Sequence, residues 1–163
     1  MIDSNKLTGA VAALLDEYKK AIDELIITIS PLNPLQLSEI VNPTATDEDS
    51  RSVQNILSHV LSSIYSYSVY IENSIGLDTV RPERFIADDV REYIIQLNSG
   101  FEYSKNLFVQ NPNIILEVVD GNKKINTRWG QQYDVEQLME HAIVHILRHR
   151  RQIENIIKRN FQA

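Results

Sequence analysis

The stretch that decides the fold is DVEQLMEHAIVHILRHRRQIENIIKRN, residues 134–160. Its apolar residues recur every three or four positions, which is the period of an amphipathic α-helix. Asp134 is a favourable N-cap residue, and Gln137 stands three positions on, at the spacing of a capping box. Lys158 and Arg159 lie where positive charge stabilises a helix C-terminus. The sequence therefore predicts one long helix that fills this stretch.

This helix carries three of the four histidines of the chain, His141, His145 and His149. Neutral histidine is the commonest metal ligand among side chains, and two histidines four residues apart can direct ring nitrogens at one cation. On a helical wheel His149 falls within the apolar stripe and His145 at its edge, whereas His141 lies farther toward solvent. His145 and His149 are therefore the candidate metal ligands of this helix, and His141 is their competitor.

The chain is acidic and contains no cysteine. Its 163 residues, of which 43% are apolar, predict a single domain over 1–163 that can bury a core without cross-links. The absence of cysteine excludes disulfides, thiolate metal sites and a cysteine nucleophile, so thiol chemistry would need a thiol from a substrate. The formal net charge of −6 argues against nucleic acid as a partner, because phosphate binding requires clustered lysine and arginine.

Apolar runs in the sequence are short. None approaches the roughly 20 residues that cross a bilayer, so we expect no membrane partner. The first residues also lack the basic, apolar and small-residue pattern of a secretory signal, which favours the cytoplasm.

The helical period also predicts three earlier helices. Their approximate bounds, set by cap residues and by stop signals such as Gly76 and Pro112, are Leu7–Ile29, Ser50 or Ser52 to Ser74, and Asp88–Val109. Three of the five prolines lie in residues 31–49, which predicts a long loop there.

A dipeptide typical of tight turns precedes the last helix. Asp120 and Gly121 separate the β-prone runs 114–119 and 123–129, and Asp-Gly between such runs predicts a β-hairpin. A two-stranded hairpin is not stable alone, so this one must pack against the helices.

Four long helices and one small hairpin predict an all-α fold, a four-helix bundle with a hairpin before its last helix. In such bundles, sites are built in the core by side chains on facing helices. The last helix is also apolar on its far side, at Ile143, Val144 and Leu147. Either the hairpin or a second subunit should cover that side, and we favour a homodimer.

The fourth histidine, His59, lies at the margin of the apolar stripe of the second helix, beside Ile56 and Ser63. Taken alone, a histidine at such a position is more often a hydrogen-bonded core residue than a metal ligand. In that case His59 and the other histidines would form hydrogen bonds with one another, with Tyr65 or Tyr93, or with water.

Two segments resemble a known family. SRSVQNILSHV, residues 50–60, and HAIVHILRHRRQI, residues 141–153, look like the corresponding helices of the DinB-like, or YfiT-like, metal-binding four-helix proteins. The resemblance extends over the whole chain, but its specific part is one histidine in the second helix and His-x-x-x-His followed by Arg and Gln in the last. It implies a bundle with a crossover connection and a divalent metal held by His59, His145 and His149.

The resemblance also implies an activity. Three neutral imidazoles suit Zn²⁺ or Ni²⁺, and an open coordination position makes a nucleophile of a bound water or substrate thiol. Characterised members of the family include S-transferases that use low-molecular-weight thiols and a mycothiol-dependent isomerase. The expected function is thus metal-dependent transfer of such a thiol to a small electrophile. Arg151 stands where the family often has glycine, which argues against copying a relative's substrate pocket.

The alternative is a non-catalytic, stress-associated bundle protein whose histidines are structural. Neither a catalytic residue nor a general base can be assigned from the sequence. Asn55, Ser63 and Glu140 are the candidate partners of the metal ligands. Trp129 and Tyr133, just before the last helix, could line a pocket or anchor the hairpin to the bundle.

Overall fold

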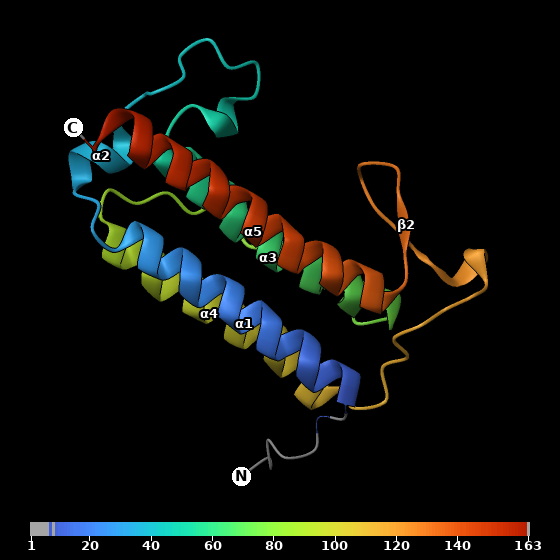
Figure 1. Ribbon diagram of the computed structural model, residues 1–163. Helices are drawn as coiled ribbons and strands as arrows, with labels where there is room; N and C mark the ends of the chain where they lie inside the picture. Colours follow the sequence, from blue (N-terminus) through green and yellow to red (C-terminus); the bar gives the residue numbers. More distant parts are fainter. Residues whose placement is uncertain (1–6, 8, 163) are drawn as a thin grey trace.

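Four long helices form the protein in the computed structural model, which describes residue 7 and residues 9–162. Their bounds are α1 Gly9–Ile29, α3 Val53–Ser74, α4 Val90–Gln110 and α5 Val135–Asn160. Helix α1 packs against α4 and α5, and α3 packs against the same two helices. In Figure 1, α1 and α5 run in one direction along the bundle and α3 and α4 in the other. The predicted all-α bundle is confirmed.

The core lies between the four helices and consists of the predicted apolar stripes. On α3 the buried positions recur at intervals of three and four, and its fully covered apolar side chains are Val53, Ile56, Leu57, Val60, Ile64 and Ile71. Helix α4 comes very close to α3 at Gly100, where an added Cβ would lie 3.0 Å from Cγ2 of Ile64. Glycine at this position therefore allows the two helices to pack closely.

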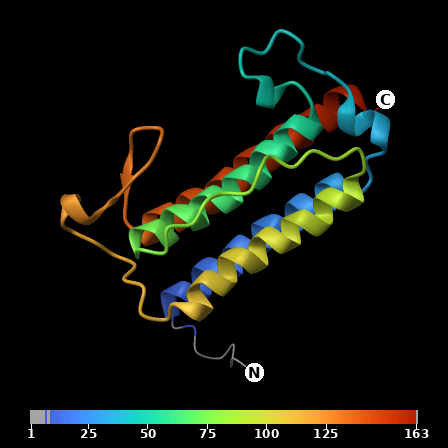
Figure 2. The ribbon, with the colours of Figure 1, turned by 180° about the vertical axis from the view of Figure 1, so that it is seen from behind.

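A long crossover, residues 75–89, joins α3 to α4 and returns along the whole length of α3 (Figure 2). At its start, the Asn73 side chain accepts a hydrogen bond from the backbone N–H of Thr79 over 2.7 Å. At its end, Nε2 of Gln54 donates to the carbonyl of Ala87 over 2.9 Å. Helices α3 and α4 therefore begin at the same end of the bundle, as the crossover implied by the family resemblance requires.

The predicted loop over 31–49 is wrong in part, because it contains the short helix α2, Pro34–Ser38, and leads into a 3-10 turn, η2, Glu48–Ser50. The side chains of Asn33 and Gln36 form a reciprocal capping box, and proline occupies the first helical position. Proline is tolerated there because that N–H has no helical partner anyway. The density of prolines obscured this local helix signal.

The predicted hairpin exists in a different place. Its strands are β1 Ile125–Asn126 and β2 Gln132–Tyr133, which pair antiparallel. Asp120 and Gly121 do not form its turn: the Asp120 side chain caps a 3-10 turn, η3, Gly121–Lys123. The run 114–119 pairs with no strand, and β propensity alone does not supply a partner.

Helix α5 has the predicted start, because Asp134 and Gln137 form the expected capping box. On its far side, Val144 is 60% exposed and Leu147 is 38% exposed, so the hairpin leaves this face uncovered. A second subunit over this face remains a prediction. None of the helices among residues 9–162 has an apolar stretch long enough to cross a bilayer.

Candidate metal centre

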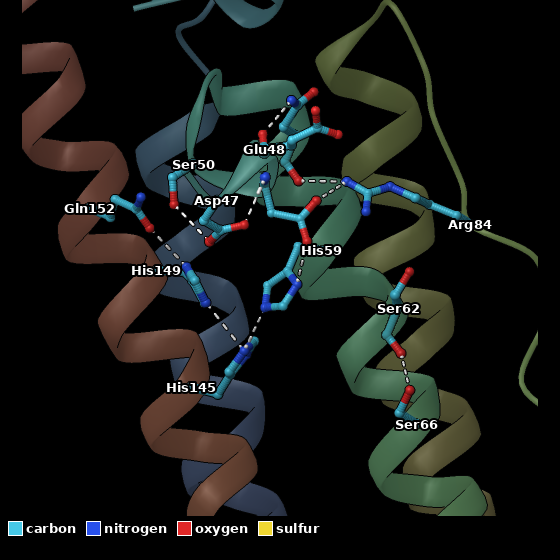
Figure 3. A network of polar contacts seen from close by, with 12 residues as sticks. Asp47, Glu48, Ser50, His59, Ser62, Ser66, Arg84, His145, His149 and Gln152 are labelled. Carbon is cyan, nitrogen blue, oxygen red and sulfur yellow. Dashed lines mark hydrogen bonds and ion pairs between the residues drawn. The ribbon is translucent and has the colours of Figure 1, made fainter. Parts of the chain in front are cut away.

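The three histidines singled out in the sequence meet between α3 and α5, where one ring nitrogen from each points to a common centre (Figure 3). Nε2 of His145 lies 3.0 Å from Nε2 of His59 and 3.2 Å from Nε2 of His149. One ring nitrogen from each of the three histidines lies within 4.8 Å of the other two. The fold thus brings together two residues of one helix with a residue 86 positions away from the nearer of them.

Helix geometry explains this convergence. His145 and His149 are one turn apart on α5, and α3 runs antiparallel beside them with His59 on the facing side. His149 is buried, as the helical wheel predicts.

His141 does not join the cluster. Its Nδ1 lies 3.2 Å from the Tyr133 hydroxyl, and its ring stacks on Trp129 with centroids 5.4 Å apart. The choice of His145 and His149 over His141 therefore agrees with the geometry.

Two of the three rings are oriented by acceptors on their outer nitrogens. Nδ1 of His59 lies 3.1 Å from Oδ2 of Asp49, and Nδ1 of His149 lies 2.9 Å from Oε1 of Gln152. An acceptor at Nδ1 holds the ring proton there and leaves the lone pair on Nε2. Both rings therefore present lone pairs to the centre, which is the tautomer that a metal ligand needs.

Asp49 is itself held by a cation. Arg84 of the crossover donates from Nη2 to Oδ1 of Asp49 over 2.6 Å. Burial raises the pKa of Asp49, but the hydrogen bond and charge of Arg84 outweigh it and hold the pKa below its usual value. The carboxylate therefore stays ionised and keeps accepting from His59.

His145, the central ring, is neutral. Burial, followed by the neighbouring His149 and His59, lowers the pKa of His145 to about 2. Burial also lowers the pKa of His149. Nδ1 of His145 is buried and has no hydrogen-bond partner among the described residues.

The spacing of the three nitrogens fits a metal ion. A tetrahedral ion with metal–nitrogen bonds of about 2.0–2.1 Å separates its ligand nitrogens by about 3.3 Å. The two closest pairs here are 3.0 and 3.2 Å apart. Without a cation, Nε2 of His145 could carry only one proton, and that proton would have to form hydrogen bonds with the Nε2 lone pairs of both His59 and His149. A cation at the centre satisfies all three nitrogens.

A cavity of about 730 Å³ reaches the cluster from the side of His59 and His145. Its walls come from η2, α3, the crossover, the hairpin and α5, and include Asp49, Ser63, Tyr67, Arg84, Arg128, Trp129, His141 and Arg148. Trp129 both lines this cavity and packs edge-on against Tyr67 and Tyr70. It therefore fills both of the roles considered for it, whereas Tyr133 does not line this cavity.

Among the described residues, none of the partners expected for the ligands makes a hydrogen bond to a histidine ring. Nδ2 of Asn55 donates to the carbonyl of Glu48 over 2.8 Å and so ties η2 to α3, Ser63 lines the cavity, and Glu140 is exposed. The histidines also make no bond to Tyr65 or Tyr93; the Tyr93 hydroxyl lies 2.8 Å from that of Ser58. Sequence reasoning missed Asp49 and Arg84 because both lie in connections without a periodic pattern, whereas Gln152 belongs to the quoted motif.

Replacing Asp49 with asparagine should weaken metal binding by about 10- to 100-fold, the usual cost of losing a carboxylate behind a ligating histidine. The substitution removes the charge that fixes the His59 proton on Nδ1. Competition against a chromophoric chelator measures the affinity. Glu48→Gln is the matched control, because Glu48 is the adjacent acid of η2 and pairs with Arg51 instead. Equal affinities of the two variants would contradict this role of Asp49.

Comparison of the sequence with known proteins gives no matching family model and no matching curated protein. The resemblance to the DinB-like proteins therefore rests on the two quoted segments alone, and membership of that family stays a prediction.

Proposed function

We propose that this protein is a metal-dependent enzyme that holds one divalent transition metal, Zn²⁺ or Ni²⁺, through His59, His145 and His149. We further propose that it transfers a low-molecular-weight thiol to a small electrophile. The observation that carries the metal site is the convergence of three Nε2 atoms while acceptors occupy the outer nitrogens of two rings.

The donor set supports the choice of metal. Neutral imidazoles suit Zn²⁺, Ni²⁺ and similar first-row ions, whereas Mg²⁺ and Ca²⁺ prefer oxygen ligands. Three protein ligands on a tetrahedral or larger coordination sphere also leave a position open, as in catalytic zinc sites. The cavity beside His59 and His145 gives a small molecule access to that side of the cluster.

The surrounding residues support chemistry that needs no strong protein base. A divalent cation held here supplies Lewis acidity, which lowers the pKa of a thiol or water that reaches it. Asp49 is the one carboxylate among the described residues of the cavity wall, and its lowered pKa makes it a poor base. Burial raises the pKa of Tyr67, so its hydroxyl stays protonated. The thiol must come from a co-substrate because the chain has no cysteine.

The non-catalytic alternative has one observation in its favour. The Nε2 separations of 3.0 and 3.2 Å are also hydrogen-bond distances, so the histidines could bond to one another in a metal-free core. Metal content separates the two functions.

Elemental analysis of protein purified without a metal-affinity tag or chelator tests the proposal. We expect about one equivalent of a transition metal per chain, or uptake of about one equivalent on adding Zn²⁺ or Ni²⁺. Metal-loaded protein should then accelerate conjugation of a small thiol to a chromogenic electrophile, and chelation should remove that acceleration. Less than about a tenth of an equivalent with no uptake would overturn the metal site. Full metal loading without thiol turnover would overturn the transferase activity alone.

A further inference from the structure

The cavity beside the histidines is rich in arginine. Four of the 16 basic side chains of this acidic protein line it. Arg81 and Arg84 come from the crossover, Arg128 from the hairpin and Arg148 from α5. Segments far apart in the sequence thus converge to place positive charge around one cavity.

Three of these arginines have no acidic partner in the part of the chain that the structure describes. Arg84 is neutralised by Asp49, the one carboxylate of the cavity wall among the described residues. Within residues 7 and 9–162, Arg81, Arg128 and Arg148 form no ion pair. In a protein of net charge −6, three unpaired cations around one concave surface concentrate positive potential there.

The charge of Arg148 acts inside the cavity. Burial and then the Arg148 guanidinium lower the pKa of His141, a neighbouring wall residue. Arg148 thus lines the cavity together with His141 and His145.

One wall of the cavity is aromatic and packs directly against the histidines: the centroid of the Tyr67 ring lies 5.7 Å from that of the His145 ring. The backbone N–H of Arg128 donates to the Tyr70 hydroxyl over 2.9 Å, which fixes the hairpin loop on α3. Trp129, the next residue, packs edge-on against Tyr67 and Tyr70 and stacks on His141. A rigid apolar surface thus lies directly beside the arginine side chains.

We propose that this cavity binds a small organic anion, with its carboxylate or phosphate group among Arg81, Arg128 and Arg148 and its apolar body against Trp129. Guanidinium groups bind both kinds of oxyanion through paired N–H donors. The other end of the molecule lies toward His145. The interpretation of this anion as a substrate rests on the proposed function. The existence of the anion site does not depend on that function.

Trp129 supplies the test, because it is the single tryptophan of the chain and lines the cavity. Tryptophan fluorescence and calorimetry follow titrations with phenyl phosphate, benzene-1,2-dicarboxylate and uncharged benzyl alcohol. We expect saturable binding of at least one of the two anions, weakened by added salt, and no binding of benzyl alcohol. The anion that binds more tightly identifies the oxyanion. Binding of benzyl alcohol as tight as that of both anions would overturn the proposal.

Arginine variants show whether binding occurs at this cavity. Arg128→Gln and Arg148→Gln should each weaken binding of the preferred anion about tenfold, because each removes a charge-assisted contact. Arg151→Gln is the matched control: Arg151 is exposed on the same helix as Arg148 and does not line the cavity. We expect the affinity of the Arg151→Gln variant for the anion to stay within about twofold of that of the unmodified protein. Unchanged affinity in both cavity variants would overturn the site.

Repeating the titration with metal-free protein separates this proposal from the metal site. Anion binding that depends on Arg128 and Arg148 should persist without metal and in His145→Ala. If the protein binds no metal but shows this dependence, the anion site stands and the metal site fails. If it binds metal normally but shows no arginine-dependent anion binding, only the anion site fails.

Discussion

Replacing His145 with alanine is expected to abolish metal binding, with a loss of affinity of more than about 100-fold. His145 is the central member of the cluster, and its Nε2 lies within 3.2 Å of both other nitrogens. Without it, only one ligand on each of two helices remains, and two imidazoles hold a first-row ion weakly. Competition titration with a chromophoric chelator, supported by elemental analysis, measures the loss.

The metal-free variant should remain folded, because the substitution also removes a buried nitrogen that lacks a hydrogen-bond partner. The unmodified protein should melt at a higher temperature when Zn²⁺ or Ni²⁺ is added, and His145→Ala should not. His141→Ala is the control, since His141 lies one turn earlier on α5 and contacts Trp129 and Tyr133 instead. Equal metal affinity of His145→Ala and His141→Ala would refute the proposed ligand set.

A second large effect is expected in the core. Leu97→Ala should lower the free energy of unfolding by about 2–5 kcal/mol, because it opens a cavity where the leucine is fully buried on α4. Ile95→Ala is the matched control two residues away, where the isoleucine is 61% exposed, and should change stability by no more than about 0.5 kcal/mol. Urea denaturation followed by circular dichroism measures both. If the two variants lose equal stability, α4 does not pack through the face described.

The fold was predictable where the sequence is periodic. The capping box at Asp134 and the apolar stripes of the four long helices come from local chemistry, and the structure agrees with them. In short connections the sequence shows only local propensity, and two predictions there were wrong. The prolines of residues 31–49 obscured the helix capped by Asn33, and Asp120 and Gly121 do not form the turn of the hairpin. Strand pairing depends on which partner the tertiary fold supplies.

The site divides in the same way. His145 and His149 were predictable because one helix fixes their relation, whereas His59 was assigned as a ligand only from the resemblance to the DinB-like proteins. Asp49 and Arg84 were not predictable, because only the closed bundle brings η2 and the crossover to the same histidine. The arginines of the cavity lie on three separate segments, so no window of sequence contains the cluster.

The packing of α1 against α5 also limits the order in which this chain can assemble during synthesis. Glu24 of α1 forms an ion pair with Arg150 of α5, 126 positions later in the chain. Helices α3 and α4 can dock as soon as α4 has emerged from the ribosome, since their contacts are closer in sequence. The apolar face of α1, around Tyr18 and Ile22, must wait for the last helix before it is fully covered. The first helix to be made is therefore fully covered only after the last one, and this long-range packing slows folding relative to a bundle of consecutive neighbours.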